Sequence, residues 1–148
     1  IDKAYMTGFE AGMEVQFLDE FRFSLSAGYT YAQNQSLDEP LAEIPPFHVN
    51  TRIGYYTPKI EAIVNARIAA EQDRVAESFN ESTTPGFSVF DVKLHYLPFD
   101  FLEVFASVTN VFDKNYVQHL SRAYKNMDEA SLYYEPGRSF NLGLKFNF

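Results

Sequence analysis

The chain has 148 residues, 46% of them hydrophobic, and a formal net charge of −8. This length suits one ordinary domain, and the negative charge argues against nucleic acid or anionic lipid headgroups as partners, because both attract basic surfaces. The mean hydropathy of −0.25 and the short apolar runs exclude a membrane-spanning helix, which needs about 20 apolar residues. The first residue is Ile and no signal peptide is present, so we expect a mature or partial chain.

Seven segments alternate between apolar and polar residues. A β-strand turns successive side chains to opposite faces, so this alternation predicts strands that are apolar on one face. Two apolar residues, Ile63 and Phe105, interrupt the polar faces. In chain order, we predict strands at about residues 7–18, 21–33, 47–55, 60–71, 89–96, 102–109 and 137–148.

The last of these segments is the most regular. Its apolar positions are all Phe or Leu, and the chain stops on an aromatic residue of that face. Strands of about 9–11 residues with one apolar and one polar face are the units of a transmembrane β-barrel. The alternating residues are Phe140, Leu142, Leu144, Phe146 and Phe148 on one face and Ser139, Asn141, Gly143, Lys145 and Asn147 on the other.

The connections between the predicted strands are alternately short and long. Short turns lie near residues 19–20, 57–59 and 97–100, and long polar connections span about 34–46, 73–85 and 110–136. Bacterial outer-membrane barrels sort their connections in this way, with short periplasmic turns and long external loops. The aromatic residues gather near the strand ends, as interfacial belts require. The pattern predicts an all-β, antiparallel transmembrane β-barrel. A soluble β-sandwich is the alternative, although its strands would be shorter.

Several short motifs are shared with a known family. They are Val108–Tyr116, Pro136–Phe140 and the terminal Phe148, with Pro40–Leu41, Ile44–Pro46, Glu71–Ala76 and Thr84–Phe87 upstream. Together they resemble the C-terminal region of TonB-dependent outer-membrane receptors. The resemblance implies that residues 1–148 form about the last seven strands of a roughly 22-stranded barrel. The plug domain and the N-terminal strands are then expected outside this sequence.

The resemblance also implies a function. Such a receptor is a multi-pass protein of the cell outer membrane that takes up a metal complex, with TonB supplying energy through the absent N-terminal part. An iron–siderophore is the first expectation, and copper or cobalamin complexes are further ones. The expected partners are outer-membrane lipid, the barrel-assembly machinery, TonB and the metal-chelate ligand, with no nucleic acid and no resident cofactor. A small autonomous outer-membrane barrel, acting as an adhesin or structural protein, is the alternative.

Two groups of residues are candidate functional sites. The last strand resembles the assembly signal of outer-membrane barrels at Asn141, Gly143, Phe146 and Phe148, although the same residues suit any lipid-facing strand. The longest connection offers the second group, as candidate contacts for the ligand. It consists of Tyr116, His119, Tyr124, Met127, Asp128, Tyr133 and Tyr134.

Metal binding and catalysis have weaker support in the sequence. His119 and Met127 are soft ligands that could bind copper, but two residues eight apart in a connection do not define a metal site. No arrangement of nucleophile, base or clustered metal ligands completes an active site. We therefore expect a protein that is not an enzyme.

Overall fold

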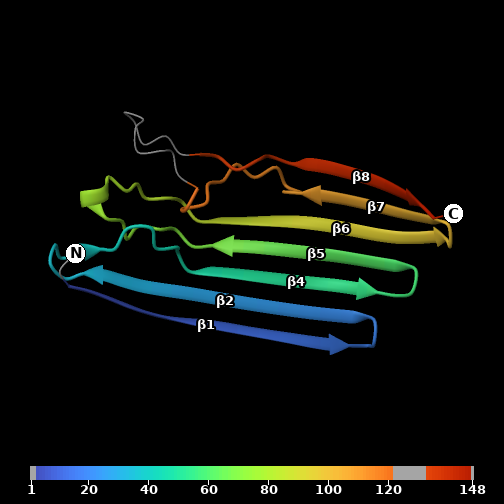
Figure 1. Ribbon diagram of the computed structural model, residues 1–148, viewed down its shortest axis with the longest axis horizontal. Helices are drawn as coiled ribbons and strands as arrows, with labels where there is room; N and C mark the ends of the chain where they lie inside the picture. The colour runs from blue at the N-terminus through green and yellow to red at the C-terminus, as the bar shows by residue number, and fades with distance from the viewer. Residues whose placement is uncertain (1–2, 122–132, 148) are drawn as a thin grey trace.

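The computed structural model describes residues 3–121 and 133–147, and the eight strands within them form one antiparallel sheet. The strand order is β1-β2-β4-β5-β6-β7-β8, so neighbours in the sheet are neighbours along the chain (Figure 1). No helix among the described residues is long and apolar enough to cross a membrane. The seven long strands are β1 (Ala4–Phe17), β2 (Phe21–Asn34), β4 (His48–Tyr56), β5 (Ile60–Ala69), β6 (Phe87–Phe99), β7 (Leu102–Thr109) and β8 (Ser139–Phe146).

These strands confirm the seven antiparallel segments predicted from the alternation, with two differences. A two-residue strand, β3 (Glu39–Pro40), pairs with the end of β2, and it is too short to leave a periodic pattern. The predicted turn at residues 97–100 is wrong in its first part, because β6 continues to Phe99. The β6–β7 register shifts between Tyr96 and Phe99, and this irregularity accommodates Pro98, which has no N–H for the ladder.

The register aligns the apolar positions of all seven long strands on one face. Leu25, for example, lies opposite Met13 of β1 and Thr51 of β4, and the pattern continues to Val108 opposite Phe140 of β8. Within the described residues, the sheet has no second layer, and Phe140 is 72% exposed. A β-sandwich would bury this face against another sheet, so the sandwich alternative is wrong.

The opposite face carries polar and charged pairs across the strands. Arg52 Nε donates to Asn65 Oδ1 at 2.9 Å, and Arg67 Nε lies 3.6 Å from Asp91 Oδ2. The two apolar interruptions have local explanations. Ile63 lies opposite Gly54, and Phe105 lies opposite Gly143 and stacks on His95. The absent side chain of Gly54 makes room for the ring of Tyr56, and Gly143 lies against Phe105 without crowding it.

The connections sort to the two ends of the sheet. The short turns lie at one end and the long connections at the other (Figure 1). We call the long connections the first loop (residues 35–47), the second loop (70–86, with the 3₁₀ turn η1, Glu77–Phe79) and the third loop (110–138). Aromatic rings of the apolar face gather at both ends. At the turn end Phe17 stacks on Phe21, whose ring also contacts Tyr55 at a tilt, and at the loop end Phe9 contacts Tyr29 and Phe47.

Candidate functional site: the roots of the three long loops

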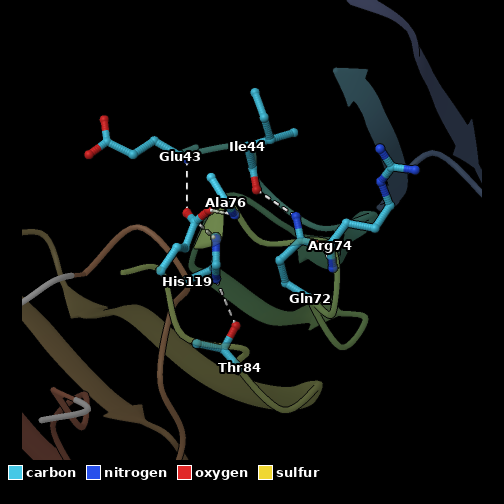
Figure 2. A network of polar contacts seen from close by, with 8 residues as sticks. Glu43, Ile44, Gln72, Arg74, Ala76, Thr84 and His119 are labelled. Atoms are coloured by element: carbon cyan, nitrogen blue, oxygen red, sulfur yellow. Dashed lines mark hydrogen bonds and ion pairs between the residues drawn. The ribbon is translucent and has the colours of Figure 1, made fainter. Parts of the chain in front are cut away.

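One buried carboxylate connects the three long loops (Figure 2). The Glu81 side chain, in the second loop, is 1% exposed. Its Oε1 accepts a hydrogen bond from the backbone N–H of Glu43 in the first loop at 2.9 Å, and its Oε2 accepts one from Ala76 at 2.8 Å. His119 of the third loop places Nε2 at 3.2 Å from the same Oε1. Segments distant in sequence are therefore fixed to a single side chain.

His119 is as deeply buried as its partner. Its side chain is 2% exposed, and Nδ1 lies 3.0 Å from the hydroxyl of Thr84. Two backbone N–H donors favour the ionised form of Glu81, and in that form His119 Nε2–H donates to the carboxylate while Nδ1 accepts from Thr84. Burial lowers the pKa of His119, because the charged ring would lose its hydration. The arrangement therefore suits a neutral imidazole.

A second set of contacts joins the first two loops. Gln72 Nε2 donates to the carbonyl oxygen of Ile44 at 2.7 Å, and the backbone of Gln72 pairs with Thr84 in an isolated bridge. Arg74 extends the network towards β2, donating to Gln33 Oε1 at 2.9 Å. These contacts use side chains to satisfy backbone groups that the strand ladders leave unpaired.

Glu39 of β3 forms a further link between these loops. Its carboxylate accepts hydrogen bonds from the Ser78 hydroxyl and, at 3.1 Å, from the Ser78 backbone N–H. The hydroxyl and backbone bonds from Ser78 lower the pKa of Glu39, since they favour the charged form. These hydrogen bonds are exposed to water, so we expect them to stabilise the loops less than the buried hydrogen bonds of Glu81 do.

The two ends of the third loop meet at Asn110. This residue is 3% exposed and has a left-handed backbone with φ of 51°, a conformation that asparagine tolerates better than most residues. Its Nδ2 donates to the carbonyl oxygens of Lys114 at 2.8 Å and Pro136 at 3.3 Å, and its Oδ1 accepts from the Lys114 N–H. Its own N–H donates to Asp91 Oδ1 at 2.8 Å. One side chain thus closes the base of the loop onto β6.

The structure separates the candidate ligand residues into three groups. Tyr116 and His119 are buried, and the Tyr116 hydroxyl accepts a hydrogen bond from Arg67 while its ring packs on Phe87. By contrast, Tyr133 and Tyr134 are 48% and 59% exposed. The role of this set in ligand contact stays a prediction. Tyr124, Met127 and Asp128 lie outside the described residues.

The candidate assembly residues lie on β8, an edge strand of the described sheet. Asn141 and Gly143 lie on the polar face, opposite Ser107 and Phe105, and Phe146 lies on the apolar face. Phe148 is outside the described residues. The geometry fits both a signal and an ordinary lipid-facing strand, so the assembly role stays a prediction.

Sequence reasoning missed the residues at the centre of the loop network, Glu81, Gln72 and Thr84. Periodicity carries no information about them, because they lie in connections and act on backbone groups of other loops. The motifs at Glu71–Ala76 and Thr84–Phe87 marked two of the positions, without a role. Among residues 3–121 and 133–147, no group of three or more His, Asp or Glu side chains could hold a metal ion.

Comparison with protein families identifies the class of protein. A family model described as TonB dependent receptor-like, beta-barrel matches residues 1–111. The chain belongs to this family. A comparison with curated proteins found no match.

Solved structures of TonB-dependent receptors have the same fold. The copper transporter OprC is 27% identical with a TM-score of 0.82, and the match covers 98% of this chain and 24% of OprC. The ferric enterobactin receptor PfeA from Pseudomonas aeruginosa is 22% identical with a TM-score of 0.71, covering 95% and 22%. The siderophore receptor PiuA from Acinetobacter baumannii is 18% identical with a TM-score of 0.72, covering 97% and 22%.

The chain therefore spans about a quarter of each of these receptors. PfeA and PiuA show the fold alone at their identities. The family match and these structures confirm the antiparallel barrel architecture, and the sheet is one part of such a barrel. The proteins in this family are receptors and transporters, and the resemblance drawn from the motifs of the sequence is confirmed at this level.

Proposed function

We propose that residues 1–148 form a C-terminal portion of the barrel of an outer-membrane receptor that takes up a metal complex with energy supplied through TonB. The observation that carries this proposal is the exposed, largely apolar face shared by seven strands of a family member. In lipid, such a face needs no second protein layer, and the closed barrel satisfies every backbone group. The long loops would then face outwards and the short turns the periplasm.

The plug domain and the segment that contacts TonB belong to this proposal as parts of a longer protein. The polar face of the sheet, with mixed charges such as Arg52, Arg67, Asp91 and Lys93, suits a lumen that is filled by protein. A selective pore would favour one sign of charge. The barrel-assembly machinery and outer-membrane lipid are the further partners that this placement requires.

Two classes of substrate are candidates. An iron–siderophore is the expectation from the resemblance to the family, within which the ferric enterobactin receptor PfeA and the siderophore receptor PiuA share the fold of this chain. Copper is the second candidate, because the copper transporter OprC is more similar to this chain than those two receptors are, in both identity and TM-score. The small autonomous adhesin-like barrel has no such support.

The experiment uses the full-length protein in the outer membrane of cells with and without TonB. Uptake of radiolabelled iron bound to catecholate or hydroxamate siderophores, and of radiolabelled copper, is measured in parallel. We expect accumulation of one of these labels that is lost in cells without TonB. Equal accumulation in both strains, or none above cells that lack the receptor, would refute the proposal.

A further inference from the structure

We propose that Glu81 and His119 are positioning residues, which hold the exposed Tyr133–Tyr134 pair of the third loop in place for ligand binding. The inference rests on the proposed function for the identity of the ligand. It concerns residues that the sequence did not distinguish and a histidine that the sequence suggested as a ligand itself.

The first step is the attachment of the third loop to the second. The hydrogen bond from His119 to Glu81 is charge-assisted and almost completely screened from water, with both side chains at most 2% exposed. Such bonds are among the stronger ones in proteins. Thr84 holds the other ring nitrogen, so the ring cannot rotate without losing both contacts (Figure 2). His119 is therefore fixed in orientation as well as in position.

The second step joins His119 to the exposed tyrosines. The backbone N–H of Glu135 donates to the carbonyl oxygen of Tyr116 at 2.9 Å, and the Ser121 hydroxyl donates to Glu135 Oε1 at 2.6 Å. Glu135 directly follows Tyr133 and Tyr134. The outgoing and returning parts of the loop are thus bonded to each other on both sides of His119, and a displacement of His119 would move the tyrosines.

The third step is that the hydrogen bonds holding the three loops all involve Glu81. Glu81 also holds the first loop, through the N–H of Glu43, and its own loop, through Ala76. All three loops are therefore positioned by the Glu81 carboxyl group. Ligand binding gains affinity from a surface that is ordered before the ligand arrives, because less ordering entropy is lost on association. Release of Glu81 should weaken binding without any loss of direct contact.

The test uses the full-length receptor with four variants. Glu81→Gln leaves one of the backbone N–H groups facing an amide NH₂ group. His119→Leu removes both ring contacts, whereas His119→Gln keeps a donor near the position of Nε2. The matched control is Glu71→Gln, which makes the same charge change at an exposed residue of the second loop.

Two quantities are measured on each variant. Amide hydrogen exchange over residues 76–84 and 116–121 reports the attachment of the loops, and it needs no ligand. Equilibrium binding of Cu²⁺ and of ferric catecholate and hydroxamate siderophores reports the positioning. We expect about tenfold faster exchange and about tenfold weaker binding for Glu81→Gln and His119→Leu, the loss of one charge-assisted bond. His119→Gln should be close to the unaltered receptor, and the thermal unfolding midpoint of the barrel should not change.

The outcomes separate the parts of the proposal. Unchanged exchange in Glu81→Gln would overturn the attachment, and faster exchange with unchanged affinity would overturn the positioning role. Equal effects from Glu71→Gln would also overturn the assignment to the buried group. If the unaltered receptor binds none of the probes, the proposed function and the positioning role both fail, while the exchange arm still decides whether Glu81 holds the loops.

Discussion

The sheet is stabilised in a different way from the loop roots, by which we mean the parts of the three long loops held by Glu81, Gln72 and Asn110. Along the strands, backbone ladders join each strand to its neighbours with one irregularity at Tyr96–Phe99, and the side chains only have to be apolar on one face and mostly polar on the other. At the loop end, backbone groups without ladder partners are satisfied by single side chains such as Asn110, Glu81 and Gln72. The strands therefore tolerate many residues of the right polarity, whereas each loop root depends on particular residues.

The largest expected effect comes from placing a charge on the lipid face. Leu25→Arg puts a guanidinium between Met13 and Thr51 in the middle of β2, and we expect a loss of about 2–4 kcal/mol in folding free energy. The adjacent Ser26→Arg points to the polar face, where the cost should be within about 0.5 kcal/mol. Urea unfolding of the full-length receptor in lipid vesicles measures both. Similar losses at the two positions would contradict the assignment of faces.

Asn110 offers a more local break at the loop end. Asn110→Ala removes three side-chain hydrogen bonds in a buried position, and we expect the base of the loop to lose about 2 kcal/mol of local stability. Asn110→Gly keeps the left-handed backbone without strain, so it should lose about 1 kcal/mol less than alanine. Hydrogen exchange over residues 110–116 measures the difference. Equal losses of local stability in the alanine and glycine variants would show that the left-handed backbone at residue 110 does not affect the result.

Acid should loosen the loops before it affects the sheet. Burial lowers the pKa of His119 below that of a free imidazole, so the neutral ring stabilises the loops fully above the ordinary imidazole pKa, and this stability is lost as the pH falls towards the folded-state pKa. The titratable group in contact with the ring is Glu81, and the backbone N–H of Glu43 in the first loop is bonded to the same carboxyl group. We expect faster exchange over residues 116–121 at pH 5.5 than at pH 7.5, after correction for intrinsic rates.

The matching control for this pH effect is His119→Gln, which has no titrating ring. Its exchange over the same residues should change less between the two pH values. An equal change in both proteins would assign the acid effect to another group. Glu39 is a poor explanation for it, since the pKa of its carboxyl is lowered and its contact with Ser78 should persist until well below pH 5.5.

The smallest effect on stability is expected at Gly143. A methyl group there would approach Phe105 Cβ to 3.8 Å, an ordinary contact, so Gly143→Ala should leave the folded barrel unchanged. If Gly143 and Phe148 act as an assembly signal, Gly143→Ala and deletion of Phe148 should still reduce the amount of receptor in the outer membrane. Pulse labelling and fractionation measure this amount. Unchanged levels in both variants would favour the interpretation of these residues as ordinary strand positions.

The contrast between strands and loops also explains what the sequence could predict. The alternation of apolar and polar residues located all seven long strands. Each strand has one apolar face and one largely polar face, and residues of the two faces alternate along the sequence. The alternation could not place β3, where Gln33 and Asn34 pair with only two residues. It also took Leu97–Phe99 for a turn, because Pro98 is unusual within a strand.

The candidate site was predicted less well, for a physical reason. Tyr116 and His119 were chosen as ligand contacts because they are metal- and ligand-binding residue types in a long connection, yet both are buried among other loops. Whether a loop residue is buried depends on tertiary contacts with segments distant in sequence, and these contacts cannot be predicted from a local sequence pattern. The motif around Asn110 was noticeable, but its role followed only from the bonds to Lys114 and Pro136.

Because a few buried side chains hold the three loops, the other loop residues should be replaceable. The exposed residues Ser36 and Leu37 of the first loop are distant in sequence from Glu81, Gln72 and Asn110, whose side chains hold the loops. Replacing such exposed residues while keeping those three should therefore change the outer surface of the proposed receptor without changing how its loops are held.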